Sequence, residues 1–367
     1  MPRMSLSLVV LLVLLSACGE KEPLRIGFIG GLSGRFADLG TPGRNGAMLA
    51  VELRNQQGGI GGRKNELLIR DDQQDPEVAK KGIDDLLAHQ VKAIIGPMTS
   101  SIAAAVVPRM NDARVLLMGA TVTTASLSGR DDYFYRVVGT TATYASYAAR
   151  YHYEKLGLRT AALVLDVANL DYTESWVSEY AKTFESLGGK VVARVPFDSR
   201  ADKSYLRIAG VLSEAKPEIV ALACSSVDGA LIAQNLRKLD KSVRLAGSGW
   251  TATERLTELG GQAVEGMLVE QYFDRFDESP RYKAFHKAFF DRFGQEPGFA
   301  GTTAYDAAMA VFAALEKDPS VKDLKKSLAE MKRFQGVQGE IVFDEFGDAS
   351  RKTYLNEVSR GQFVPVK

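Results

Sequence analysis

The sequence contains few of the residues that most often perform catalysis. Only two cysteines and three histidines occur among its 367 residues. The G-x-S-x-G motif of a hydrolase nucleophile and the H-E-x-x-H motif of a zinc protease are also missing. Cys224 lies in the apolar run IVALAC and is expected to be a small buried residue rather than a catalytic thiol. We therefore expect no catalytic residue, no metal site and no cofactor.

Neither sign of charge is in excess. The 46 Lys and Arg residues nearly balance the 45 Asp and Glu residues, and the formal net charge is +1. Such a chain has no broad basic field that could attract a phosphate backbone, so we expect no nucleic-acid partner. The chain is also too long for one ordinary core, and its length indicates about two domains.

The apolar run at the N-terminus is too short to cross a membrane. It extends from Leu8 to Leu15, whereas a spanning helix needs about 20 apolar residues. Arg3 precedes the run and small residues follow it, which is the pattern of a signal peptide. The sequence Leu15-Ser16-Ala17-Cys18 resembles the bacterial lipobox, in which the cysteine is diacylated and becomes the first mature residue. An ordinary signal peptide with a cysteine at its cleavage site is the alternative.

We therefore expect residues 1–18 to be a lipoprotein signal peptide that ends at a lipidated Cys18. The mature chain is then exported and anchored by lipid to a bacterial membrane, facing the periplasm or the cell exterior. Cys224 is left without a partner for an intrachain disulfide, so stability must come from the packed core.

Strands and helices alternate along the rest of the chain, which predicts parallel sheets covered by helices on both faces. Strands are expected at 24–31, 66–70, 94–95, 114–118, 160–165, 190–195, 218–223 and 243–246. Helices are expected near 42–55, 75–89, 172–187, 203–214, 228–239, 279–293 and 302–316.

We therefore predict an α/β fold of two doubly wound parallel-sheet lobes joined by a multi-strand hinge. Residues 24–139 and 272–344 form the first lobe, and residues 140–271 and 345–367 form the second. Ligands of doubly wound sheets bind beyond the carboxyl ends of the strands, so two facing lobes can close over one small molecule.

The segment from Lys92 to Pro108, KAIIGPMTSSIAAAVVP, predicts a strand, a loop and a helix. Thr99, Ser100 and Ser101 stand where the helix begins, so their hydroxyls and the first free N–H groups face one region. The positive end of a helix combined with several donors suits an anion such as a carboxylate. Plain capping is the alternative, because Ser and Thr are preferred at the start of any helix.

Seven segments, in this order, resemble the type I periplasmic binding proteins of the branched-chain amino acid class. They are GGLSGRFADLG, GGIGGR before ELLIRDDQQDP, IIGPMTSS, LLMGATVTTASL, AGSGW, AVEGM and GEIVFDEFGD. The resemblance implies a two-lobed receptor, not an enzyme, that captures a small solute and delivers it to the permease of an ABC transporter. A lipid anchor fits that role.

The resemblance also implies how a carboxylate is held. The family's carboxylate site corresponds to the hydroxyl of Ser100 and to the loop with Gly119 and Thr121. The two acids that bind the ammonium group in amino-acid-binding relatives correspond to Thr141 and Gly249, so both acids are missing here. An unpaired buried ammonium would cost several kcal/mol, so either another acid replaces them or the ligand carries no ammonium group.

Asp166 and Asp228, in the second lobe, are the candidates for a replacement acid. Each has an ordinary alternative, since Asp228 could cap the following helix and Asp166 could be a solvated residue at the end of a strand.

Aromatic residues are expected to surround the other end of the ligand. Tyr172 matches a loop tyrosine that stacks on the ligand in the family. Trp250 directly follows Gly249, the position of a missing acid, and Phe299 lies near the return crossing to the first lobe. Such a pocket favours an apolar or aromatic side chain. Ser33 and Arg35 are expected at the mouth of the cleft, where Arg35 could meet a carboxylate or be solvated.

The sequence therefore predicts a receptor for an apolar or aromatic amino acid. The alternatives are an aromatic or aliphatic organic acid without an ammonium group, and a ligand-sensing subunit for a signalling partner.

Overall fold

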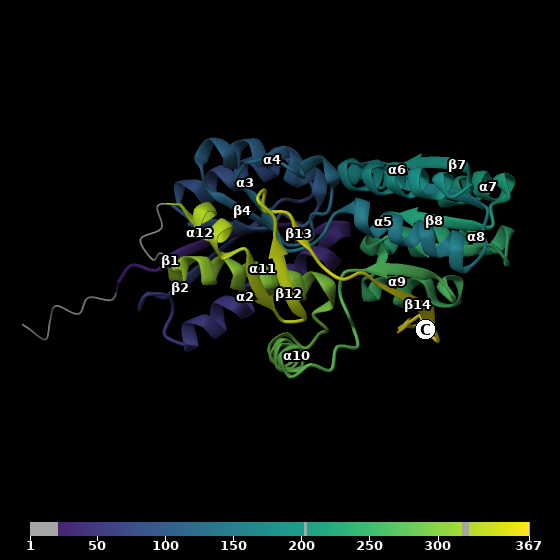
Figure 1. The fold of residues 1–367 in the computed structure, drawn as a ribbon. Coiled ribbons are helices and arrows are strands. Elements are labelled where there is room, and N and C mark those ends of the chain that lie inside the picture. Colours follow the sequence, from purple (N-terminus) through teal and green to yellow (C-terminus); the bar gives the residue numbers. More distant parts are fainter. Residues whose placement is uncertain (1–20, 202–203, 318–322, 367) are drawn as a thin grey trace, which may run out of the picture.

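The computed structural model describes residues 21–201, 204–317 and 323–366. It contains two lobes, each built on its own sheet, which lie side by side (Figure 1). The predicted signal peptide, with Cys18, lies outside the described residues. Within the described ranges, no helix is long and apolar enough to cross a membrane.

The first lobe has a five-stranded parallel sheet in the order β2-β1-β3-β4-β5. Its strands are β1 (Leu24–Gly30), β2 (Asn65–Asp71), β3 (Ala93–Ile95), β4 (Leu116–Gly119) and β5 (Phe134–Arg136). Its helices are α2 (Ala37–Gln56), α3 (Pro76–Ala88), α4 (Ser100–Ala113), α10 (Pro280–Phe293), α11 (Gly298–Lys317) and α12 (Leu324–Met331).

Both faces of this sheet are buried, which explains its uninterrupted apolar strands. Ile29 belongs to the core that includes Ile83 of α3 and Val106 of α4. Phe28, on the opposite face of the same strand, belongs to the core that includes α2 and α11. Because side chains alternate along the strand, β1 packs against a layer of helices on each face of the sheet.

The second lobe has a seven-stranded sheet in the order β15-β14-β10-β9-β8-β6-β7. The parallel strands are β6 (Thr160–Asp166), β7 (Lys190–Phe197), β8 (Ile219–Ala223), β9 (Arg244–Gly247) and β10 (Leu268–Gln271), and the antiparallel pair is β14 (Tyr354–Ser359) with β15 (Gln362–Pro365). The helices are α5 (Thr141–Arg150), α6 (Leu170–Ser186), α7 (Tyr205–Ala215), α8 (Ser226–Leu239) and α9 (Glu254–Gly260).

The chain passes between the lobes after β5, after β10 and after β13. A third, small sheet is formed by β11 (Arg333–Gly336), β12 (Gly339–Phe343) and β13 (Ala349–Ser350). Because β13 pairs with β12, the last crossing follows Ser350 rather than the expected Asp344.

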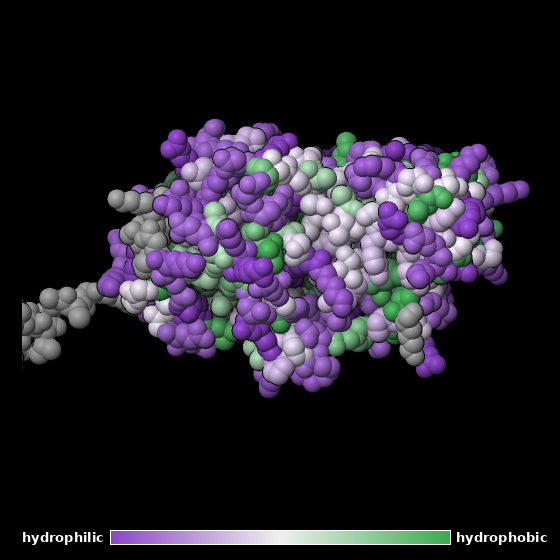
Figure 2. Space-filling view, in the orientation of Figure 1, coloured by the Kyte–Doolittle hydropathy of each residue, from purple (hydrophilic) through white to green (hydrophobic). Residues whose placement is uncertain are grey.

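Short 3-10 helices follow four of the parallel strands at the edge where the lobes face one another. They are η1 (Gly34–Phe36), η2 (Ala125–Leu127), η4 (Val167–Asn169) and η5 (Gly249–Thr251), and a further one, η6 (Gly261–Val264), follows α9. Away from this edge, the face shown in Figure 2 is mainly hydrophilic, with only small and separate apolar areas. The region between the lobes is therefore the expected place for a binding site.

Candidate functional site

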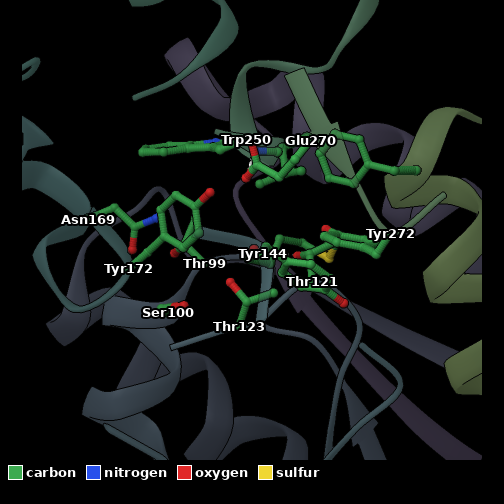
Figure 3. Close-up of a pocket in the computed structure, with 14 residues that line it drawn as sticks. Thr99, Ser100, Thr121, Thr123, Tyr144, Asn169, Tyr172, Trp250, Glu270 and Tyr272 are labelled. Carbon is green, nitrogen blue, oxygen red and sulfur yellow. Dashed lines mark hydrogen bonds between the residues drawn. The ribbon is translucent and has the colours of Figure 1, made fainter. Parts of the chain in front are cut away.

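A cavity lies between the lobes, at the carboxyl ends of strands from both sheets (Figure 3). It holds about 420 Å³ of atom-free space, part of which is open to solvent. Side chains of both lobes line this space, and its size suits a small molecule. The lining residues are Leu39, Met98, Thr99, Ser100, Thr121, Thr123 and Phe299 from the first lobe, and Tyr144, Asn169, Tyr172, Gly249, Trp250, Glu270 and Tyr272 from the second lobe or the crossing after β10.

One wall of the cavity is the start of α4. Thr99 occupies the N-cap position, yet its side chain accepts no hydrogen bond from the first turn. Its Oγ1 instead donates to Oε1 of Gln74 at 3.0 Å. The backbone N–H of Ser101 donates across the cleft to Oδ1 of Asn169 at 3.1 Å. Ordinary capping therefore does not account for the hydroxyl residues at this helix end, which leaves the positive end of α4 facing the cavity.

Hydroxyl groups extend this wall. Ser100 Oγ accepts a hydrogen bond from the N–H of Thr124 at 3.3 Å, so its O–H remains free to donate. Thr121 Oγ1 donates to the carbonyl of Met98 at 2.5 Å. Thr123 Oγ1 is buried and has no hydrogen-bond partner among the described residues. The wall thus offers donors that the protein does not itself use.

Glu270, on β10, lies across the cavity from Ser100 and Thr123 in Figure 3. Its Oε1 accepts hydrogen bonds from Nε1 of Trp176 at 2.8 Å and from the N–H of Gly249 at 2.9 Å. Its Oε2 is buried and has no partner among the described residues. Burial raises the pKa of the Glu270 carboxyl to about 8. The cavity therefore has a hydroxyl wall and an opposite carboxyl group.

Sequence reasoning did not identify Glu270. One feature of the sequence could have indicated it, namely an acid inside the otherwise largely apolar segment MLVEQYF, from Met267 to Phe273. An ionisable residue in a buried strand is rare unless it has a partner or a function.

Gly249, where the resemblance places a missing acid, directly adjoins Glu270. A Cβ atom at position 249 would lie 3.3 Å from the backbone oxygen of Glu270 and 3.9 Å from its Oε1. The absence of a side chain therefore leaves room for the Glu270 carboxyl. Thr141, at the other missing acid, is buried outside the lining, and its hydroxyl lies 2.6 Å from that of Ser175.

Asp166 and Asp228 do not lie on the cavity wall. The Asp166 carboxylate accepts from the backbone N–H groups of Ala168 and Ser199, both at 3.0 Å, and burial raises its pKa. The sequence made both residues candidates for the pocket because it indicates where strands end and helices begin but not where the side chains point.

Asp228 instead joins the lobes. Its carboxylate is fully buried and forms an ion pair with Arg35 of the first lobe. It also accepts from Tyr205 Oη at 2.8 Å and from Ser225 Oγ at 2.5 Å. Ser225, rather than Asp228, is the N-cap of α8. Asp38, close to Arg35 in sequence, accepts across the cleft as well, from Ser226 Oγ at 2.6 Å and Thr253 Oγ1 at 2.8 Å.

Three further sequence-predicted residues, Arg35, Ser33 and Gly119, do not line the cavity. Arg35 is engaged with Asp228, and Ser33 is exposed before η1. Gly119 ends β4 and accepts from the N–H of Val137 at 3.2 Å. The described part of the chain contains no cluster of His, Cys, Asp or Glu that could hold a metal ion.

Aromatic rings form the rest of the wall. Tyr172 and Trp250 meet edge to face at 5.8 Å between centroids, and Trp250 stacks on Phe36 of the first lobe at 5.6 Å. Phe299 meets Tyr272 at 5.7 Å. Tyr144 of α5 also lines the cavity and meets Tyr272 at 5.2 Å. The site can therefore enclose an apolar or aromatic group between two polar ends.

An enclosed site between two hinged lobes, with binding groups but no catalytic set, is typical of a solute-binding receptor. The family model described as periplasmic binding protein matches residues 23–362, so the chain belongs to this family. The predicted fold is confirmed by this match and by the solved structures below.

The relatives are binding proteins, not enzymes. The leucine-, isoleucine-, valine-, threonine- and alanine-binding protein of Pseudomonas aeruginosa is 25% identical over 329 residues, which cover 89% of this chain and 87% of the relative. The crystal structure of a leucine-binding protein from Thermotoga maritima has a TM-score of 0.87 and 24% identity, covering 94% of this chain and 98% of that one. A solute-binding protein of an ABC transporter from R. palustris, in complex with benzoate, has a TM-score of 0.84 and 20% identity, covering 94% and 95%.

Proposed function

We propose that this protein is the extracytoplasmic receptor of an ABC importer and captures a small carboxylate with an apolar or aromatic body. An apolar or aromatic amino acid is the first candidate. The observation that carries the proposal is the hydroxyl wall at the start of α4, where the Thr99 side chain does not cap the helix and the wall faces the cavity between the lobes. We further propose that the chain is anchored through Cys18 to a bacterial membrane and delivers its ligand to the permease.

The ligand carboxylate would lie at the start of α4. Ser100 Oγ and Thr123 Oγ1 can donate to it, and the helix end favours its negative charge. Hydrogen bonds to a charged group contribute about 1.5–3 kcal/mol each. No lysine or arginine lines the cavity, so these dipoles supply the attraction.

An organic acid without an ammonium group is the second candidate. Five aromatic side chains from Tyr144 to Phe299 line the site, and a structural neighbour holds benzoate. Flat aromatic acids suit edge-to-face walls of this kind. A third candidate is a sensing subunit, which would use the same cleft with a signalling partner in place of the permease.

A thermal-unfolding screen of amino acids beside their deaminated acids and their amides tests the proposal. Ligand at 100 times its Kd stabilises the folded state by about 2.7 kcal/mol. We expect carboxylates with apolar bodies to raise Tm and the matching amides to do so much less. Ser100→Ala and Thr123→Ala should each weaken binding by about 1–3 kcal/mol, because each removes a hydroxyl that is free to donate to the carboxylate. The O–H of Thr121 is already donated to the carbonyl of Met98.

Ser186→Ala is the matched control, since Ser186 ends α6 and does not line the cavity. Equal binding of acids and amides, or full affinity in both cavity variants, would contradict the proposal.

A further inference from the structure

We propose that Glu270 recognises an ammonium group on the ligand, so that the cleft takes zwitterionic amino acids in preference to their deaminated acids. This inference rests on the proposed binding of a carboxylate in the same cavity. It goes further in naming the residue that chooses between the first two ligand candidates.

The unused oxygen of Glu270 is the central observation. Oε1 already accepts from Trp176 and Gly249, whereas Oε2 is buried at the cavity without a partner in the described part of the chain. The residue is only 2% exposed. No lysine, arginine or histidine is among the residues that line the cavity. A buried carboxylate without a cation is unfavourable, so this group requires either a proton or a cationic partner.

The surroundings hold the carboxyl in place. Trp176 is almost fully buried and stacks on Tyr180 at 5.2 Å, so its N–H cannot move away from Oε1 without breaking the stack. Gly249 contributes its N–H from η5 and leaves free the space that a side chain would fill. An oriented carboxyl with one free oxygen is a preorganised acceptor.

The two polar ends of the cavity match the two charged groups of an amino acid. Ser100 and Thr123 lie on the side of the first lobe, and Glu270 faces them from the second lobe (Figure 3). A zwitterion would bridge these groups and thereby favour closure of the lobes. A deaminated acid would satisfy only the hydroxyl wall and would leave Glu270 protonated.

Binding of an ammonium should release a proton. Without a cationic partner the carboxyl keeps its proton at neutral pH, since burial raises its pKa to about 8. When the charged ammonium enters, the O–H bond of Glu270 breaks, the proton leaves to solvent, and a carboxylate–ammonium pair forms.

The titratable side chains on neighbouring elements do not compete with Glu270 for the ammonium group. The titratable residues packed around Glu270 are the phenols Tyr144, Tyr172, Tyr180 and Tyr272, and burial raises the pKa of each of them. On β14, the strand paired with β10, the residue opposite Glu270 is Leu355. Affinity for an ammonium ligand should therefore rise with pH by up to about tenfold per unit below pH 8 and then level off.

Calorimetric titration tests this proposal, with L-leucine and L-phenylalanine as probes beside 4-methylpentanoate and 3-phenylpropanoate. Measurements at pH 6, 7 and 8 in buffers of different ionisation enthalpy report proton release. Glu270→Gln keeps the acceptor oxygen for Trp176 and removes the charge. Glu258→Gln makes the same change on the exposed surface of the second lobe.

We expect the wild type to prefer the amino acids and to release about one proton at pH 6. Glu270→Gln should lose about 10- to 100-fold in affinity for the amino acids, lose the proton release, and bind the deaminated acids nearly as before. Glu258→Gln should behave as the wild type.

Unchanged amino-acid affinity in Glu270→Gln, or binding without proton release, would overturn the inference. Binding of the deaminated acids alone, with sensitivity to Ser100→Ala, would overturn the ammonium site and leave the carboxylate site standing. Failure of all four probes and of the wider carboxylate screen would overturn both proposals.

Discussion

The ion pair between Arg35 and Asp228 should control closure of the cleft. The two residues belong to different lobes, and neither lines the cavity. Arg35→Met removes the charge and keeps most of the side-chain length. In the closed form the variant leaves a buried carboxylate without its cation, whereas opening would expose that carboxylate to water.

The structure sets the size of this effect. Loss of one partner of a fully buried pair costs about 3–5 kcal/mol. The Arg35 side chain is 26% exposed, however, and Asp228 retains Tyr205 and Ser225 as donors. We therefore expect the closed form to lose about 1–3 kcal/mol, which raises the Kd about 5- to 150-fold. The hydrogen bonds from Ser226 and Thr253 to Asp38 remain, so closure should be weakened and not abolished.

The assay combines ligand affinity with small-angle scattering. Arg35→Met should bind a ligand found in the screen more weakly and have a larger radius of gyration when ligand is absent. Arg194→Met is the control, since its pair with Glu174 is exposed, lies within the second lobe and should contribute at most about 1 kcal/mol. Equal affinity and equal compactness of Arg35→Met and the wild type would refute the reasoning.

Two further predictions concern stability. Burial lowers the pKa of His152 to about 3, below the ordinary value of about 6.5, so the unfolded chain binds the proton first. The free energy of unfolding should therefore fall by up to about 1.4 kcal/mol per pH unit as the pH drops below 6.5. Urea unfolding at pH 7 and pH 5 should show a smaller pH dependence in His152→Phe, and an unchanged dependence would contradict the assignment. Gly46 of α2 packs against the carbonyl of Gly301 in α11, so Gly46→Ala should lower the free energy of unfolding by about 1–3 kcal/mol. Gly210→Ala is the control. It adds a methyl group in open space on α7 and should raise the free energy of unfolding slightly.

The fold was predictable because its signals are local. Apolar runs bounded by glycine gave the strands, and Asp75 with Pro76 marked the start of α3, where the Asp75 side chain accepts from two backbone N–H groups. Ser100 could be proposed for the same reason, since a helix start follows from neighbouring residues.

The second-lobe acids were not predictable because their partners are distant. Arg35 and Asp228 are 193 positions apart, and Trp176 and Glu270 are 94 apart. From the sequence, Asp228 was an acid at the start of a helix with no visible counter-charge, and Glu270 was one residue within a strand. Only the packing of the two lobes brings Asp228 into an ion pair and Glu270 to the wall of the cavity.

Tryptophan fluorescence tests the central claim, that the ligand occupies the cavity between the lobes, most directly. The chain has two tryptophans; Trp250 lines the cavity and Trp176 donates to Glu270. Titration with a ligand found in the screen should give a saturable change in emission with the calorimetric Kd, and Trp250→Phe should remove most of that change. Calorimetric binding that leaves the emission of both tryptophans unchanged would contradict the account.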